Sequence, residues 1–71
     1  MSIESTAPRL TAREQQVLDL LAKGMTNQQI ATELQIGYRT ARFHVASLFR
    51  KLGAENRAHA VAVAARFGLL N

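Results

Sequence analysis

The sequence predicts an all-α domain, a four-helix bundle that contains a helix-turn-helix. Three observations carry this prediction. Apolar residues recur at helical spacing in four segments, capping residues or glycines bound these segments, and none shows the period-two alternation of a strand. With 71 residues and no cysteine, the chain forms one small domain whose modest stability must come from packing.

The first helix is expected at about residues 12–23. Thr11 and Glu14 have the spacing of a capping box, in which each side chain bonds the other residue's backbone amide. Gly24 follows where a left-handed residue would end the helix. Residues 1–10 are expected to form a flexible arm, and residues 11–71 the domain. The apolar stripe of this helix consists of Val17, Leu18 and Leu21.

The second helix is expected at about residues 27–34, after a second capping box formed by Thr26 and Gln29. Its short apolar stripe consists of Ile30, Ala31 and Leu34.

Glycines and a capping asparagine delimit the last two helices. The third helix is expected at about residues 38–52, between Gly37 and Gly53. Asn56 can cap a fourth helix at about residues 57–67, which ends before Gly68.

A link of about three residues, 35–37, joins the second and third helices. So short a link fits a helix-turn-helix, here at about residues 27–46. A short helical hairpin in any bundle has the same appearance, so this feature alone favours DNA binding only slightly. The small Ala31 allows close approach, and the angle is filled by Leu34, Ile36, Ala41 and Val45.

The third helix is strongly basic. The chain has a net charge of +4, and no Asp or Glu occurs from Leu34 to Ala54. Four of the nine cationic residues lie in that stretch: Arg39, Arg42, Arg50 and Lys51. A local positive field of this kind favours a nucleic acid partner over a merely solvated surface.

The outer side of the third helix suits the major groove of DNA, where arginine is the commonest reader of guanine. A helical wheel puts Arg39, Phe43, Ala46 and Arg50 on one stripe, with Thr40 and Ser47 beside it. Edge positions meet phosphates, and the wheel puts Arg42 at one edge. The base-facing residues expected from the wheel are Arg39, Phe43, Ala46, Ser47 and Arg50. The expected backbone contacts are Thr26, Asn27, Thr40, His44 and Lys51.

Residues 10–70 resemble the LuxR-type DNA-binding domain, the tetrahelical domain of LuxR and NarL/FixJ regulators and of GerE. The landmarks are "LTAREQQVL", "GMTNQQIATELQI", "RTARFHV", "RKLGAENRAHAV" and the closing "GLL". The resemblance implies a transcriptional regulator that binds two half-sites as a dimer through a recognition helix at about residues 38–52. It also implies that Arg42, Phe43 and Ala46 face bases, and that Thr40, His44 and Lys51 face the backbone. Because the wheel puts Arg42 at the flank of the groove, base and phosphate roles both stay open for it. The chain departs from the family at Gly37, where Ser or Thr is usual, and at Ala41, where Val is usual. Lys is common in the family at the position of Arg42.

The fourth helix is apolar almost all round, which is typical of a helix that also forms an interface. Ala60, Val61, Ala64 and Phe67 are expected to face the core. The opposite side is expected to form a homodimer contact, which the resemblance supports, although alanine is also a good helix former on any surface. That contact would use Ala58, His59, Ala62, Val63, Ala65 and Arg66. We further expect Glu14 and Arg57 to pair, because both fall toward the apolar sides of their helices.

The sequence does not favour an enzyme. His44 and His59 are the only histidines, with no nucleophile or carboxylate pair arranged around them, so we expect no catalytic residue, metal ion or cofactor. The main rival function is a helical protein-interaction module, an anti-activator or adaptor that uses the fourth helix without reading DNA. RNA binding is a third reading, but the aromatic platform that single strands require is missing.

Other partners and the location follow from the same features. No apolar run is long enough for a membrane span, so we expect no membrane contact, a cytoplasmic location and association with the nucleoid when bound. RNA polymerase is a further candidate partner, and no small-molecule ligand is expected in this chain. Ten residues before the domain are too few for a receiver or an autoinducer-binding module. The activity of the protein would then be controlled by its own concentration, by its dimerisation or by another protein. If the chain is instead a fragment of a longer protein, the regulatory part has been removed.

Overall fold

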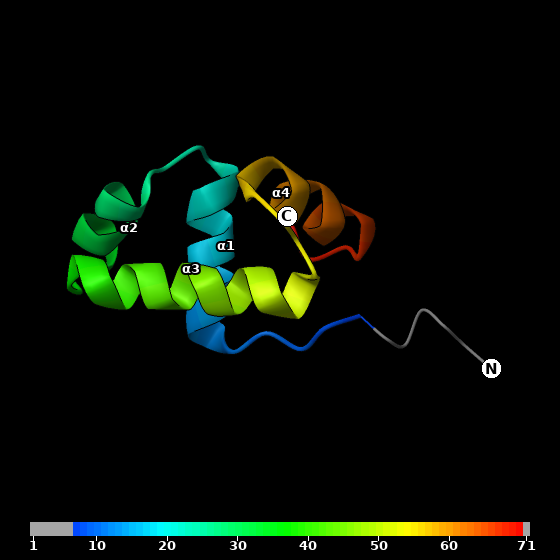
Figure 1. Ribbon diagram of the computed structural model, residues 1–71, viewed down its shortest axis with the longest axis horizontal. Helices are drawn as coiled ribbons and strands as arrows, with labels where there is room; N and C mark the ends of the chain where they lie inside the picture. Colours follow the sequence, from blue (N-terminus) through cyan, green and yellow to red (C-terminus); the bar gives the residue numbers. More distant parts are fainter. Residues whose placement is uncertain (1–6, 71) are drawn as a thin grey trace.

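The computed structural model describes residues 7–70 and contains four helices in that range and no strand. They are α1 (Ala12–Ala22), α2 (Asn27–Leu34), α3 (Tyr38–Leu52) and α4 (Arg57–Arg66). Figure 1 shows α3 crossing α1, with α2 on one side of α1 and α4 on the other. The predicted all-α class is confirmed, and the expected helix ends differ by one residue at α1 and at α4.

Reciprocal capping boxes fix the starts of α1 and α2. The Thr11 hydroxyl accepts a hydrogen bond from the backbone amide of Glu14 at 3.1 Å, and the Glu14 carboxylate accepts one from the Thr11 amide at 2.9 Å. Thr26 and Gln29 form the same pair of bonds at 3.1 and 2.9 Å. Both boxes predicted from the sequence are confirmed, and they set the direction in which each helix leaves its loop.

The starts of α3 and α4 are capped differently. The Asn56 side chain accepts from the His59 amide at 2.9 Å and caps α4 as predicted. Gly37 caps α3 with no side-chain hydrogen bond. Apart from its two neighbours in the chain, a Cβ added at Gly37 would meet no heavy atom of the described residues within 4 Å, so there is open space on that side of the helix start.

All four helices end in the paired backbone bonds of a Schellman motif. In α2 the Ile36 amide donates to the Ala31 carbonyl at 3.0 Å, and the Gln35 amide donates to the Thr32 carbonyl at 3.2 Å. This motif needs a left-handed residue, and the other three helices use glycines for it, namely Gly24, Gly53 and Gly68. Helix α2 uses Gln35 instead, at φ 56°. The turn before α3 is therefore closed by a residue that carries some backbone strain.

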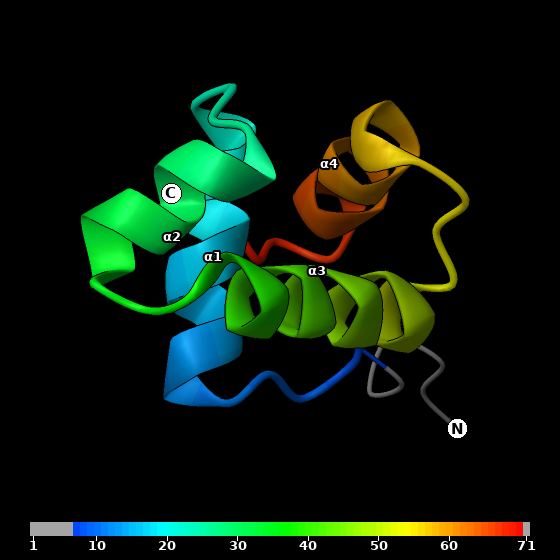
Figure 2. The same ribbon diagram turned by 60° about the vertical axis from the view of Figure 1, so that its left-hand side comes forward.

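A single apolar core joins the four helices, and α3 packs against each of the others. At the α2–α3 crossing the small residues Ala31 and Ala41 are 2% and 0% exposed, which allows the two helices to approach closely, as the sequence predicted. The short turn between them is visible in Figure 2. One side of α3 is thus committed to the core, and its other side faces outward. The core residues are Val17, Leu18, Leu20, Leu21, Ile30, Ala31, Ala41, Val45, Leu48, Leu52, Ala60, Val63 and Ala64.

The predicted orientation of α4 is partly wrong. Val63 was expected on the outer side, but it is 5% exposed and belongs to the core. Val61 is only half-buried, and Phe67 is 38% exposed, although both were expected to face the core. The error has a physical cause, because small apolar residues on every side of a helix give no contrast from which to choose a face.

The segment before α1 is held against the domain where the structure describes it. Residues 7–10 have no regular secondary structure, and Leu10 packs against the core. The remainder of the predicted arm, residues 1–6, lies outside the described residues.

Candidate nucleic-acid interface

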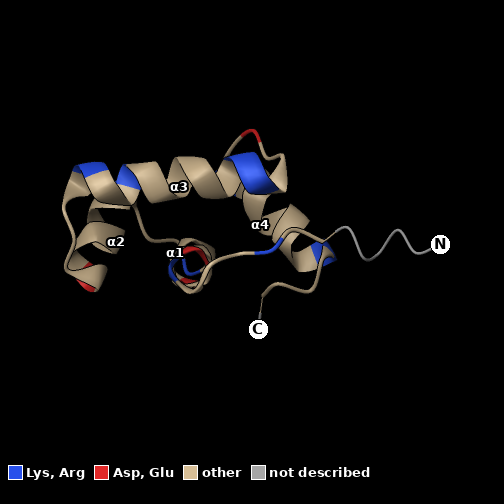
Figure 3. Cartoon of the chain, turned by 90° about the horizontal axis from the view of Figure 1, so that it is seen from below, with Lys and Arg blue, Asp and Glu red and all other residues tan. Residues whose placement is uncertain are grey.

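The outer side of α3 presents exposed arginines around an exposed aromatic ring. Phe43 is 66% exposed, more than any other large hydrophobic residue that the structure describes. Figure 3 shows basic residues along α3, and the acidic residues among residues 7–70 lie elsewhere, on α1, on α2 and in the loop after α3. The other exposed residues of this side are Arg39, Thr40, Arg42, Ala46 and Arg50. Their placement agrees with the surface expected from the helical wheel.

The Phe43 ring does little to cover its neighbours. Its recorded aromatic contact is an edge-on approach to the half-buried His44, with ring centroids 6.1 Å apart. Two-thirds of the side chain remains in solvent, at a cost in hydrophobic free energy. An exposed ring flanked by cations is suited to a partner with apolar groups inside a negatively charged surface, such as thymine methyl groups in a DNA groove.

Arg42 lies at the edge of this surface, against the ring of Tyr38. The guanidinium carbon of Arg42 is 5.9 Å from the centroid of the Tyr38 ring, within the range of a cation–π interaction. Tyr38 is 48% exposed. The sequence analysis did not single out Tyr38, although the spacing of four residues in one helix is the signal that brings the two side chains together.

Ser47 and Lys51 turn inward to a buried carboxylate. Lys51 Nζ donates to Glu14 Oε1 at 2.7 Å, and Ser47 Oγ donates to Glu14 Oε2 at 3.2 Å. Lys51 also donates to the Arg9 carbonyl at 3.1 Å. The structure therefore does not place Ser47 on the base-facing surface, and it ties Lys51 to α1 and to the segment before it.

These donors stabilise the ionised form of Glu14. The hydrogen bond from Lys51, followed by that from the Thr11 amide, lowers the pKa of Glu14 from 4.5 to about 2. Burial opposes the shift, whereas Ser47 and the charge of Lys51 add to it. The side chain of Glu14 is 8% exposed and that of Lys51 is 37% exposed. The pair thus fixes α3 against the start of α1 while leaving part of the lysine in water.

The expected pair of Glu14 and Arg57 is wrong. Arg57 Nη2 donates to the side-chain oxygen of Asn27 at 3.1 Å, and Nη1 donates to the carbonyl of Met25. Arg57 therefore ties the start of α4 to the start of α2. Glu14 takes its cation from α3 because Lys51 reaches that end of α1.

The two residues at the start of α2 that were predicted to meet the DNA backbone, Thr26 and Asn27, both have hydrogen-bonding roles within the domain. Thr26 is exposed and Asn27 is half-buried. Thr26 uses its hydroxyl oxygen to cap the helix, and Asn27 uses its amide oxygen to accept from Arg57. Each retains a donor, the hydroxyl proton of Thr26 and the amide protons of Asn27, that suits an anionic oxygen.

The outer side of α4 is smaller than predicted once Val63 is assigned to the core. His59 accepts from the Glu55 amide through Nδ1 at 3.2 Å, which fixes its ring beside the start of the helix. The exposed residues that remain of the predicted contact are Ala58, His59, Ala62, Ala65 and Arg66.

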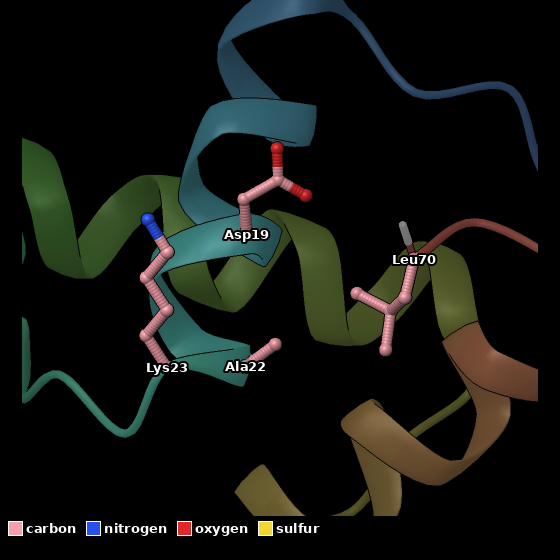
Figure 4. A pocket seen from close by; sticks show the side chains of 4 residues that line it. All are labelled: Asp19, Ala22, Lys23 and Leu70. Carbon is pink, nitrogen blue, oxygen red and sulfur yellow. The ribbon is translucent and has the colours of Figure 1, made fainter.

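A surface hollow of about 360 Å³ lies away from α3, between α1 and the segment after α4. Figure 4 shows Asp19 and Ala22 of α1 and Lys23, the residue directly after α1, on one side and Leu70 on the other. Ala22 and Lys23 are exposed, Asp19 and Leu70 are half-buried, and no residue of the lining is fully buried. Ligand sites usually combine an apolar enclosure with a few convergent polar groups, which this hollow lacks.

Residues 7–70 contain neither a cluster of metal-ligating side chains nor a membrane-spanning helix. No three His, Asp or Glu side chains gather there as a set of metal ligands. None of the four helices combines the length and the apolar character needed to cross a bilayer.

The sequence profile described as "Bacterial regulatory proteins, luxR family" matches residues 8–64. The chain belongs to the LuxR family of bacterial regulatory proteins. It is 41% identical over 63 residues to the spore germination protein GerE of Bacillus subtilis, covering 89% of this chain and 85% of GerE. It is 46% identical over 63 residues to the transcriptional activator protein BjaR1 of Bradyrhizobium diazoefficiens, covering 89% of this chain and 26% of BjaR1.

Solved structures of LuxR-type proteins have the same fold. The response regulator ChrA of a heme-sensing two-component system gives a TM-score of 0.83 at 36% identity, covering 86% of this chain and 30% of that chain. GerE gives 0.79 at 32% identity, covering 87% and 92%. VqmA of Vibrio cholerae, solved with ligand and DNA, gives 0.80 at 35% identity, covering 87% and 27%. This LuxR-type chain is a DNA-binding domain of transcriptional regulators, and at the level of the family it is not an enzyme.

Proposed function

We propose that this LuxR-type domain reads a specific double-stranded DNA sequence, with α3 in the major groove, and that it binds as a homodimer to two half-sites. The exposed side of α3 is the observation that carries the proposal. Its charges are all positive, its aromatic ring is two-thirds exposed, and the small Ala46 at its centre lets the helix approach base edges closely.

The contacts of each side chain refine the residue roles. Arg39, Phe43, Ala46 and Arg50 are exposed along the stripe and are proposed to face bases, together with Arg42. Thr40, His44, Thr26 and Asn27 are proposed to meet phosphates. Ser47 is removed from the base-facing set, because its hydroxyl donates to Glu14. Lys51 keeps only an auxiliary role, because its ammonium is shared with Glu14 and Arg9 while it still adds positive charge near the groove.

The homodimer is proposed to form through the outer side of α4, with Ala58, Ala62 and Ala65 at its centre and His59 and Arg66 at its rim. Small side chains allow two helices to pack closely. VqmA, a structural neighbour with a TM-score of 0.81, is described as a dimer that shifts conformation in the absence of target DNA. RNA polymerase is proposed as a further partner, and the cytoplasm as the location.

Selection of bound sequences from random duplexes tests this function. We expect an enriched palindrome or inverted repeat. Binding through about eight phosphates per dimer would give a slope near −7 for log K against the logarithm of salt concentration. Arg50→Gln should weaken binding, whereas Lys23→Gln removes the same charge from the far side of α1 and should change affinity far less.

Two results would contradict the proposal. No enriched sequence together with a salt slope near zero would favour a protein-interaction module that uses α4. Equal losses for Arg50→Gln and Lys23→Gln would show that net charge, and not the outer side of α3, holds the DNA.

Arg42→Ala should cost about 1–3 kcal/mol on the selected sequence if Arg42 reads a base.

A further inference from the structure

We propose that Tyr38 is a positioning residue for Arg42, and that its ring sets how sharply the domain discriminates at the base pair that Arg42 reads. The inference rests on the proposed DNA-reading function and deepens it. Neither the residue pattern of the family landmarks nor the helical wheel assigned any role to Tyr38.

The geometry of α3 brings the two side chains together. Tyr38 is the first residue of the helix, and Arg42 follows one turn later on the same side. Helical side chains lean toward the N-terminus, so that of Arg42 runs back over the ring of Tyr38. The distance of 5.9 Å from the guanidinium carbon to the ring centroid places the cation on the ring.

Among residues 7–70 no ion pair is recorded for the guanidinium of Arg42. No acidic residue occurs from Leu34 to Ala54, and the ion pair that the structure records on α3 belongs to Lys51. Gly37, the residue before Tyr38, contributes no side chain that could contact the guanidinium. The Tyr38 ring is therefore the group that restrains Arg42 in the described part of the chain.

The kind of restraint matters for recognition. A carboxylate would hold the guanidinium by occupying its N–H donors, whereas an aromatic ring holds the cation and leaves those donors available for O6 and N7 of guanine. The first residues of a recognition helix are those that meet base edges, and the ring draws the guanidinium toward them. An arginine already restrained loses less side-chain freedom on binding, and it spends less time on neighbouring phosphates.

The contact can be tested without DNA. Tyr38 is the single tyrosine and the chain has no tryptophan, so its ring is easily followed. In NMR spectra of the whole chain, the Arg42 side-chain protons should show ring-current shifts. These shifts should persist in Tyr38→Phe and vanish in Tyr38→Leu. Their absence from the unmodified protein, or their persistence in Tyr38→Leu, would overturn the inference.

The consequence is tested by repeating the selection with Tyr38→Phe, Tyr38→Leu and Arg42→Gln. Tyr38→Leu should flatten the same base position that Arg42→Gln flattens and weaken binding to the selected duplex about 2- to 5-fold. Tyr38→Phe should keep the preference, and Tyr38→Leu should cost nothing further in the Arg42→Gln background. Equal unfolding midpoints for Tyr38→Phe and Tyr38→Leu would separate this loss from damage to the fold.

The other outcomes distinguish the two proposals. If the unmodified protein enriches a sequence and Tyr38→Leu leaves its profile unchanged, the positioning role is wrong and the DNA-reading function stands. An equal loss for Tyr38→Phe and Tyr38→Leu on every duplex would instead make the hydroxyl a phosphate contact. No enrichment by the unmodified protein would overturn the proposed function, and the specificity role of Tyr38 with it.

Discussion

Replacing Glu14 by glutamine keeps the shape of a buried side chain and removes the charge that three donors surround. The pKa of Glu14 is lowered from 4.5 to about 2, and without screening by water this difference corresponds to about 3.4 kcal/mol in favour of the ionised form. Lys51 is 37% exposed, and water screens part of the interaction, so we expect Glu14→Gln to cost about 1.5–2 kcal/mol at pH 7.

The pH dependence gives a second measure of the same interaction. Because the pKa is lower in the folded state than in the unfolded chain, the stabilisation is fully present above about pH 5. It is lost progressively as the pH falls from about 5 to about 2. Urea unfolding followed by circular dichroism should therefore show the unmodified protein losing stability over that range. Glu14→Gln should lose less there, since it has no carboxyl group at this position to protonate.

The size of the expected effect is well within the reach of this assay. A domain of this size has a urea dependence of about 1 kcal/mol per molar, so the midpoint should fall by about 1.5–2 M. Glu33→Gln, at an exposed carboxylate on α2, is the matched control and should stay within about 0.5 kcal/mol. The reasoning would be refuted if the urea midpoint of Glu14→Gln differed from that of the unmodified protein by no more than the control does, and if the two proteins lost stability equally between about pH 5 and pH 2.

Four other substitutions test other contacts. Arg57→Leu removes two hydrogen bonds, to Asn27 and to Met25, from a partly buried junction. Urea unfolding should show a loss of about 1–3 kcal/mol, whereas an unchanged free energy of unfolding would show that water replaces the guanidinium freely. Gln35→Gly removes the strain of a left-handed non-glycine residue in the α2–α3 turn and should raise the free energy of unfolding by up to about 1 kcal/mol. A lower urea midpoint would mean that the added conformational freedom of the unfolded chain outweighs this strain. Ala62→Glu should leave the fold intact and abolish any dimer in sedimentation experiments, and Val63→Glu should unfold the domain, because only Val63 is buried. A dimer that persists in Ala62→Glu would move the contact away from α4.

The local rules of helix formation explain why most of the fold was predictable. Capping boxes at Thr11 and Thr26 and glycines after three of the helices mark boundaries through short-range hydrogen bonds and backbone conformation. The exposed stripe of α3 could also be predicted from the sequence, because the apolar and polar sides of this helix differ strongly. The left-handed Gln35 was not predicted, since nothing in the residue type indicates it and only the Schellman bonds of the α2–α3 turn require it.

Contacts between distant elements were harder to infer. Several cations could have met the buried Glu14, and only the crossing of α1 and α3 selects Lys51 over Arg57. That crossing also removed Ser47 from the predicted DNA surface. In α4, alanines and valines occur on every side and are similarly apolar, so the sequence does not indicate which side is buried. The burial of Val63 follows from how α4 packs on the rest of the core.

The position of α3 among the other three helices has a consequence for hydrogen exchange. Local openings usually expose elements with few buried contacts, whereas elements that hold a core together exchange only when the whole domain opens. The same helix that presents the arginines also packs on α1, α2 and α4. Amide protons in the middle of α3 should therefore exchange at the rate set by global unfolding, and any partly open form of the domain should still retain the surface proposed to face DNA.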